Sequence, residues 1–263
     1  MNILDEIISF KKNELKGLKA VSTVEELRNS YFFKLEMPSF YNSLNKQAPS
    51  IIGEFKRKSP SKGIINTHSE IEKVAIGYEE AGLAAMSILT DTNFFGGEIQ
   101  DLVKVAVVTK MPLLRKDFII DEYQIIESKS IGASAILLIA SVLTKKEIHD
   151  FSSLASDIGL DVLFEIHNEK DLEKLDSEIK IIGVNNRNLR TFEVSMENSI
   201  RLLPFLPGNC FKVAESGFKS IKDVNVLFSA GYNGFLIGEN FMKSVVPGKA
   251  AGQFIKDLKK TFE

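Results

Sequence analysis

The 263-residue sequence contains a single cysteine, Cys210, so it cannot form an internal disulfide. This scarcity indicates a reducing compartment, and Cys210 is expected to be a small buried hydrophobic residue. No apolar run approaches the roughly 18 residues of a membrane-spanning helix. The opening stretch MNILDEIISFKKNELKGL also lacks the pattern of a signal peptide. These absences predict a cytoplasmic protein with no membrane partner.

An excess of positive charge is also missing. Lysine and arginine number 33 and aspartate and glutamate 35, which gives a formal net charge of −2 and a pI near 6.1. Nucleic-acid-binding domains usually carry a net basic surface, so the composition argues against a nucleic-acid partner. The stretch KRKSPSK at residues 56–62 is locally basic. It is typical either of a basic patch that binds nucleic acid or of an ordinary solvated run of charge.

Glycine-rich nucleotide motifs are absent as well, since the chain has neither GxGxxG nor GxxxxGK[ST]. Their absence weakens the rival fold, a doubly wound open sheet. What the sequence has from residue 51 onward is a regular alternation of short apolar runs and helical patterns. The apolar runs are Ile51–Phe55, Ala84–Leu89, Pro112–Leu114, Ala135–Ile139, Val162–Phe164, Lys180–Val184, Phe211–Ala214 and Gly234–Ile237. About eight β–α units in about 210 residues predict a (β/α)8 TIM barrel.

Residues 1–49 differ from the rest because no strands alternate with their helical patterns. A stripe through Ile3, Leu4, Ile7 and Ile8 predicts one helix, and Ser22 or Thr23 is suited to cap a short second one. Further on, capping-box spacing predicts helix starts at Ser69, Thr144 and Ser220, and Asn168 is a further candidate cap for a helix over 169–175. We therefore expect one α/β domain over 1–263, with a helical extension at 1–49 and the barrel at 50–263.

Polar residues stand at the ends of nearly all predicted strands. Active sites of such barrels lie at the carboxyl ends of the strands, so these side chains are expected to share one rim. They are Glu54, Lys56, Thr90, Asp91, Lys116, Asp117, Ser141, Glu165, His167, Asn185, Asn186, Arg187, Glu215, Ser216 and Glu239. Such crowding predicts shifted pKa values: burial should raise the pKa of the carboxyl groups, and neighbouring ammonium groups should lower the pKa of the lysines.

Glycines follow the last two predicted strands, in the pairs Ser216-Gly217 and Gly238-Glu239. Backbone N–H groups at these positions of a barrel often bind phosphate, although ordinary turn glycines are the alternative. Lys58 could supply a charge to the same phosphate. His68, His149 and His167 stand alone and show no ligand spacing, so no metal site is predicted.

Eight stretches in order resemble the indole-3-glycerol-phosphate synthase family of tryptophan biosynthesis. They are GEFKRKSPSKG, TDTNFFGG, LLRKDFIIDEYQI, GASAILLI, FEIHNEKDLE, IGVNNRNLRTFEV, VAESG and FLIGENFM. The first 49 residues also resemble the helical extension of that family. The departures are small, at Phe55, Arg57 and Ala214, and none removes a polar residue with an expected role.

The resemblance implies the substrate 1-(2-carboxyphenylamino)-1-deoxyribulose 5-phosphate, which cyclises to indole-3-glycerol phosphate with loss of carbon dioxide and water. It implies no cofactor and no obligate partner chain, and it leaves a monomer open. It implies these roles: Lys116 as general acid, Glu165 as general base, Lys56 paired with the substrate carboxylate, Glu54 as a second carboxylate, and Asn185, Glu215 and Ser216 around the sugar hydroxyls.

The resemblance also implies the residues that hold the two ends of the substrate. Arg187, Phe95 and Phe118 would lie near the anthranilate end, and Lys58, Ser59, Gly217, Gly238 and Glu239 near the phosphate. For Lys116 to serve as an acid, its pKa is expected to lie near neutrality. Residue types alone leave open whether Lys116 and Lys56 exchange roles between ring closure and dehydration.

Three alternatives remain at this stage. A phosphoribosylanthranilate isomerase would need one acid and one base, which leaves the second lysine and the further carboxylates unexplained. A phosphate-binding scaffold barrel would keep its function without Lys116 and Glu165. A nucleic-acid-binding protein would show strongly salt-dependent binding.

Overall fold

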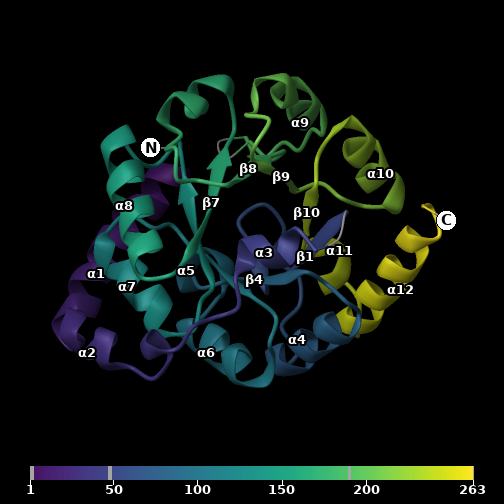
Figure 1. Cartoon of the computed structure of the whole chain (residues 1–263). Helices are drawn as coiled ribbons and strands as arrows, with labels where there is room; N and C mark the ends of the chain where they lie inside the picture. The colour runs from purple at the N-terminus through teal and green to yellow at the C-terminus, as the bar shows by residue number, and fades with distance from the viewer. Residues whose placement is uncertain (1–2, 47–48, 189–190, 263) are drawn as a thin grey trace.

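Eight parallel strands form a closed barrel in the computed structural model, which describes residues 3–46, 49–188 and 191–262 (Figure 1). Each strand pairs with its sequence neighbours, and β1 closes the barrel by pairing with both β4 and β10. The predicted (β/α)8 fold is therefore confirmed, and each predicted apolar run lies on one strand. The strands are β1 Ser50–Phe55, β4 Ala85–Leu89, β5 Leu113–Lys116, β6 Ala135–Ile139, β7 Asp161–Ile166, β8 Ile181–Asn185, β9 Phe211–Glu215 and β10 Gly234–Ile237.

Successive side chains of each strand point to opposite sides of the barrel wall, as the pleat requires. In β5, Leu113 belongs to the outer core under the helices, while Leu114 belongs to the inner core of the barrel. In β7, Leu163 lies in the inner core and Phe164 in the outer one. This alternation decides which strand-end residues face the interior.

Helices surround the barrel in a ring (Figure 1). Long helices pack amphipathic faces on the strands, and shorter elements connect them. They are α4 Ile71–Glu80, α5 Thr92–Phe95, α6 Ile99–Val108, α7 Glu122–Ser130, α8 Lys145–Asp157, η2 Glu169–Lys174, α9 Glu197–Leu202, η3 Leu203–Phe205, α10 Ile221–Ala230, α11 Glu239–Met242 and α12 Pro247–Lys259. A small hairpin of β2 Lys58–Ser59 and β3 Gly63–Ile64 lies in the loop after β1.

The helix starts test the capping predictions. Thr144 and Glu147 form the expected capping box, and the backbone N–H of Ser220 donates to Asp223. The prediction for Ser69 is wrong, because its backbone N–H donates to Asn66 Oδ1 and the helix begins one residue later, after Glu70. The segment after Asn168 is a 3-10 helix rather than an α-helix.

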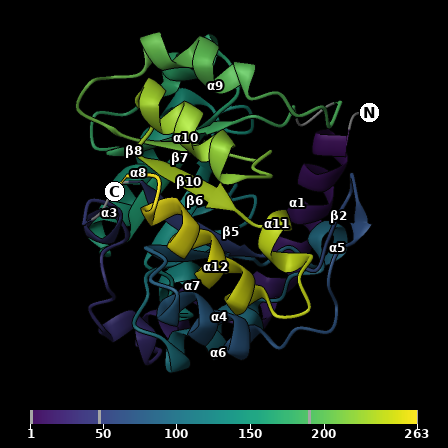
Figure 2. The same ribbon diagram turned by 90° about the vertical axis from the view of Figure 1, so that its right-hand side faces the viewer.

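The residues before the barrel form α1 Ile3–Val21, α2 Val24–Asn29, η1 Phe32–Lys34 and α3 Phe40–Leu44. Thr23 caps α2 with a complete capping box. Phe40 and Leu44 of α3 are fully buried in the inner core of the barrel. Helix α1 lies at the other end, beside α5 and β2 (Figure 2). Across the described ranges, no helix combines the length and the apolar character needed to cross a membrane.

Candidate active site

A cavity of about 470 Å³ opens at the carboxyl ends of the barrel strands. Most residues that the sequence predicts for the site line this cavity. They are Glu54, Lys56, Ser59, Phe95, Lys116, Phe118, Glu165, Asn185, Arg187, Ser216, Gly217, Gly238 and Glu239. Glu215 is fully buried beneath the cavity.

The strand pleat explains why these side chains point inward. Lys116 stands two residues after Leu114 of the inner core, and Glu165 stands two residues after Leu163. Glu215 follows the inner-core residue Val213 by the same spacing. Each of these strands therefore continues its inward row from an apolar to an ionisable side chain as it reaches the rim.

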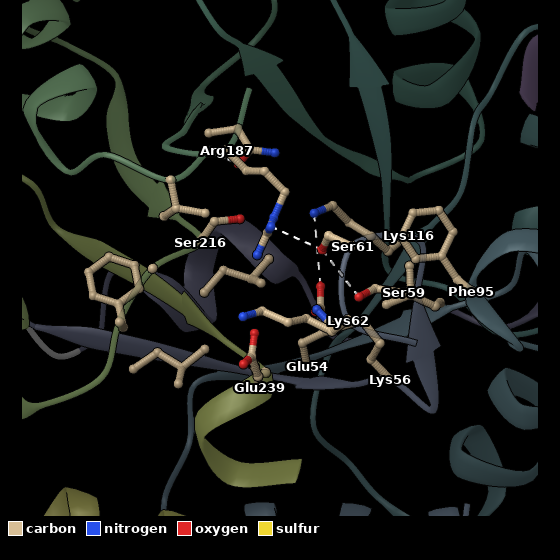
Figure 3. Close-up of a pocket in the computed structure, with 18 of the residues that line it drawn as sticks. Glu54, Lys56, Ser59, Ser61, Lys62, Phe95, Lys116, Arg187, Ser216 and Glu239 are labelled. Atoms are coloured by element: carbon tan, nitrogen blue, oxygen red, sulfur yellow. Dashed lines mark hydrogen bonds and ion pairs between the residues drawn. The ribbon is translucent and has the colours of Figure 1, made fainter. Parts of the chain in front are cut away.

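Lys116 lies among three carboxylates. Its Nζ is 2.7 Å from Glu215 Oε2, 3.6 Å from Glu165 Oε2 and 4.0 Å from Glu54 Oε2. A second lysine, Lys56, lies 2.5 Å from the other oxygen of Glu54. Figure 3 shows Lys116 and Glu54 pointing into the same space. Two ammonium groups and three carboxylates thus share one partly enclosed site.

The predicted depression of the Lys116 pKa is wrong. Burial alone lowers the pKa of Lys116, but the attraction of Glu215, Glu165 and Glu54 outweighs burial and raises the pKa above its usual value. The physical reason is that three carboxylates from three other strands lie within 4.0 Å of the ammonium group. Lys116 is therefore protonated across the physiological pH range.

For Glu215, burial is the dominant influence on the pKa. Burial, reinforced by repulsion from Glu165 and Glu54, raises its pKa to about 7 against the attraction of Lys116. Its Oε1 has no hydrogen-bond partner among the described residues. A side chain on Gly183 of β8 would place its Cβ 2.2 Å from that oxygen, so glycine makes room for the carboxylate. Glu215 therefore changes charge close to neutral pH.

Glu54 remains ionised at lower pH than Glu215. Burial raises its pKa, but Lys56 and Lys116 attract the carboxylate more strongly and lower the pKa overall. A Cβ on Gly238 would lie 2.6 Å from Glu54 Oε1. Glycine at this position therefore serves the packing of Glu54 as well as the loop after β10.

His167 lies beside the general-base candidate Glu165. Its Nε2 is 3.4 Å from Glu165 Oε1, and burial lowers the pKa of the ring. Among the described residues, neither ring nitrogen of His167 has a hydrogen-bond partner, so the imidazole lies beside Glu165 without a hydrogen bond to it.

The cavity has two chemically different ends. The rings of Phe95 and Phe118 stand with centroids 6.1 Å apart on one side. Ser216 and Glu239 lie across the pocket from Phe95 (Figure 3). Ser216 has a φ of 69°, a left-handed conformation that is strained for a residue other than glycine. Such strain is often retained at functional sites.

The side chains around the mouth are held by further contacts. Arg187 donates to Ser61 Oγ at 3.1 Å and to the Phe192 carbonyl at 3.2 Å. The Arg187 backbone N–H donates to Asn185 Oδ1 at 2.9 Å. Ser59 Oγ is 3.5 Å from Ser61 Oγ. The loop after β8 is thereby linked to the loop after β1.

The basic run at residues 56–62 is neither a solvated face nor a continuous patch. Lys56 enters the pocket, while Arg57 forms an ion pair with the buried Asp101. Lys58 turns away and donates to the Asn93 carbonyl at 2.8 Å, so the structure does not bring it to the pocket. Lys62 lines the pocket instead.

Three lysines of the site escaped the sequence reasoning: Lys62, Lys219 and Lys243 all line the pocket. Lys62 lies in the stretch already singled out, and Lys219 follows Gly217 by two residues, so closeness to a motif could have indicated both. Burial raises the pKa of Glu239, but Lys243 and Lys62 outweigh burial and lower it. In the described part of the chain, no three His, Cys, Asp or Glu side chains gather in a way that could hold a metal ion.

These features define the class of the protein: a (β/α)8-barrel enzyme whose site combines paired lysine and carboxylate groups for acid–base chemistry. The particular family follows from comparison with known proteins. The family model described as indole-3-glycerol phosphate synthase matches residues 4–256. The chain belongs to the indole-3-glycerol phosphate synthase family.

Relatives of the same name align over nearly their whole length. The protein from Bacteroides thetaiotaomicron is 42% identical over 98% of this chain and 99% of its own. That from Thermoanaerobacter pseudethanolicus is 44% identical over 98% of both chains. That from Caldanaerobacter subterraneus subsp. tengcongensis is 46% identical over 92% of this chain and 93% of its own.

Solved structures at low identity share the fold. KGPDC from Streptococcus mutans superposes with a TM-score of 0.62 at 12% identity, over 82% of this chain and all of its own. A mutant tryptophan synthase alpha-subunit from Pyrococcus furiosus gives 0.61 at 14% identity, over 81% of this chain and 99% of its own. At these identities, the likeness extends to the barrel alone.

Proposed function

We propose that this chain converts 1-(2-carboxyphenylamino)-1-deoxyribulose 5-phosphate into indole-3-glycerol phosphate, carbon dioxide and water, as its family membership implies. The observation that carries the residue roles is the position of Lys116. This ammonium faces the cavity within 4.0 Å of three carboxylates from three other strands. Such an arrangement suits a reaction that needs a proton donor and proton acceptors around one substrate.

The two ends of the cavity suggest how the substrate lies. Its anthranilate ring would lie against Phe95 and Phe118, which supply apolar surface on one side of the cavity. Its phosphate would lie at the opposite end, on backbone N–H groups of Gly217, Gly238 and Glu239. Lys62 is better placed than Lys58 to add a positive charge there, because Lys62 lines the cavity. The reacting ketone would then lie over Lys116 and Glu165.

Ring closure begins the reaction. The aromatic carbon that carries the carboxylate attacks the ketone carbon, and Lys116 donates a proton to the ketone oxygen as the carbon–carbon bond forms. Loss of the carboxylate as carbon dioxide returns the electron pair to the ring and restores aromaticity. Lys56 would pair with that carboxylate before it leaves.

Dehydration completes the indole. Glu165 takes a proton from the new ring while the hydroxyl group leaves as water after protonation by a lysine ammonium. Asn185, Glu215 and Ser216 would hold the sugar hydroxyls, and Arg187 would lie near the anthranilate end. Each step moves protons and carbon–carbon or carbon–oxygen bonds without net oxidation, so the proposed chemistry needs acids and bases but no redox cofactor.

We also propose that the chain forms one domain over 1–263, lies in the cytoplasm and acts without an obligate partner chain. These rest on the composition and on the continuity of the family match.

A fluorescence assay tests the reaction directly. The chain contains no tryptophan, so the indole product would be followed without an indole background from the protein. The synthetic substrate is incubated with the wild type and with Lys116→Met. We expect turnover by the wild type and a rate lower by about 100- to 10,000-fold in the variant.

Carbon dioxide release from carboxyl-labelled substrate serves as the second readout. Product formation without label release would overturn the proposed reaction. Equal turnover by both proteins would overturn the role of Lys116, and a folded but inactive wild type would overturn the activity itself.

A further inference from the structure

Lys11 of α1 is a buried lysine outside the pocket. It contacts two residues of the barrel rim, one just after β4 and one just after β5. Only 2% of the residue is exposed. Its Nζ is 2.7 Å from Glu14 Oε2, 3.0 Å from Asp117 Oδ1 and 3.2 Å from Asp91 Oδ2. The proposed reaction assigns it no role. A buried ammonium is costly unless it is paired, so these contacts fix the position of α1 against β5 and α5.

One partner, Asp91, organises the segment that carries Phe95. It follows β4, is 1% exposed, and caps the short helix α5. Its Oδ1 accepts the backbone N–H groups of Phe94 at 2.7 Å and Phe95 at 3.3 Å. Lys11 holds the other oxygen of the same carboxylate. A shift of Asp91 would therefore move the start of α5 and the Phe95 ring.

The other partner, Asp117, organises the backbone at Phe118. Its Oδ1 accepts the backbone N–H of Phe118 at 2.8 Å. Its Oδ2 accepts from Thr90 Oγ1 at 2.6 Å and from Arg115 Nη2 at 3.2 Å. Asp117 also follows Lys116 directly in the chain. Lys11 thus contacts the two carboxylates that set the backbone of the two aromatic rings.

We propose that Lys11 is a positioning residue for the aromatic wall formed by Phe95 and Phe118, and so determines the affinity for the ring end of the substrate. The inference rests on the proposed function, because it takes this wall as the anthranilate site. Lys11 touches neither the cavity nor Lys116, so it acts through Asp91 and Asp117.

Other contacts keep α1 in place when Lys11 is changed. Ile7 and Leu15 of α1 are buried on the barrel side. Phe10 packs edge-on against Phe94 with centroids 6.0 Å apart. Removal of the ammonium is therefore expected to loosen the two aspartates rather than to release the helix.

Lys11→Met keeps the length of the side chain and removes its charge. Affinity is measured by calorimetry for two ligands: a substrate analogue whose ketone is reduced to an alcohol, and ribulose 5-phosphate, which has no ring. For the variant, we expect the Kd of the ring-bearing analogue and the KM of the substrate to rise by about tenfold. The Kd of ribulose 5-phosphate and kcat should change by less than about threefold, because the phosphate end and Lys116 are untouched.

The matched control is Lys19→Met, on the same helix. Lys19 forms an ion pair of 2.7 Å with Asp121, and its side chain is 47% exposed. We expect unchanged Kd and KM for this variant. Asp91→Asn is the second test if Lys11→Met does not fold, since it weakens the same bridge without leaving two unpaired carboxylates. It should show the same selective loss of affinity for the ring-bearing ligand.

Several outcomes would overturn the proposal. Equal weakening of both ligands, or unchanged affinity for the analogue in a folded Lys11→Met, would leave Lys11 with a purely structural role. A loss of kcat at constant KM would also contradict positioning of the binding wall. If the wild type binds no analogue and turns over no substrate, the proposed function fails first, and the role of Lys11 fails with it.

Discussion

Strand β5 carries two charged clusters on its opposite faces, and they behave differently. Lys116 points into the barrel, among Glu215, Glu165 and Glu54, where a cavity reaches it. Arg115 points outward and is 2% exposed. It forms ion pairs with Asp117 and with Glu127 of α7 and a hydrogen bond with Thr90. Two consecutive residues of one strand thus face different surroundings: Lys116 faces the cavity, and Arg115 faces the buried layer between the strand and α7.

The difference lies in how far each cluster is bonded within the protein. In the outer cluster the guanidinium of Arg115 donates hydrogen bonds to several groups, including the Gln124 carbonyl and Ser128 Oγ. The inner cluster keeps an unbonded oxygen on Glu215 and a pKa near 7 on the same carboxyl group. A buried carboxyl group that titrates near neutrality is typical of a functional site, whereas the outer cluster holds its charges in fixed ion pairs. Function and stability are therefore assigned to alternate positions of one strand.

The sharpest test on the inner side is Glu165→Gln. Removal of the proposed general base should lower the rate of indole formation by about 100- to 10,000-fold, while the free energy of unfolding changes by less than about 1 kcal/mol. Turnover by the fluorescence assay and urea unfolding measure the two effects. A large stability loss with retained turnover would reverse the assignment of the two faces.

On the outer side, Arg115→Met should act mainly on stability. It leaves Asp117 and Glu127 buried without their shared cation, so we expect a loss of about 3–5 kcal/mol in the free energy of unfolding. Urea denaturation, with the midpoint and slope both fitted, measures the loss. An unchanged midpoint would mean that the cluster is not a stabilising element.

Glu215→Gln sharpens the comparison through pH. The folded-state pKa of Glu215 is raised to about 7, above the ordinary value of 4.5, so the folded protein binds this proton more tightly than the unfolded chain. The contribution is fully present below pH 4.5 and is lost as the pH rises through 7. Between these pH values, the wild type should lose up to about 3 kcal/mol of stability relative to the variant.

Thermal unfolding of both proteins at several pH values measures this difference. Parallel pH curves for the wild type and Glu215→Gln would show that Glu215 titrates at its ordinary pKa.

The smallest effect is expected at the surface. Lys19→Ala removes an exposed ion pair with Asp121, which should change the free energy of unfolding by less than about 1 kcal/mol. The same urea assay applies, and the comparison with Arg115→Met isolates burial as the cause. A loss as large as that of Arg115→Met would show that burial does not separate the two kinds of ion pair.

The strands and most of the rim could be predicted because both depend on local patterns. Apolar runs identified all eight barrel strands, and the polar residues expected at the strand ends, among them Glu54 and Lys116, line the cavity. The raised pKa of Lys116 escaped prediction because it depends on distances to carboxylates of other strands. The contacts of Lys11 could not be predicted for the same reason, because its partners Asp91 and Asp117 stand 80 and 106 residues further along the chain.

Side-chain direction in loops was the other source of error. Lys58 stands in the expected motif, but the short β2–β3 hairpin turns it toward Asn93, whereas Lys62 reaches the cavity. Ser69 has the right spacing for a cap, yet Asn66 accepts its backbone N–H and the helix begins later. Hydrogen bonds between near neighbours in loops decide such details, and residue spacing does not encode them.

The ion pair between Lys11 and Asp117 can form only after Asp117 has been synthesised, so it also has a consequence for folding during translation. The ribosome adds about 5–20 residues per second, so α1 is synthesised roughly 5–20 s before Asp117 is joined to the chain. Through that interval α1 has no rim to dock on, and its apolar face has no barrel to cover. The barrel itself closes only when β10 arrives to pair with β1. Helix α1 is thus made long before the barrel that it packs against can close.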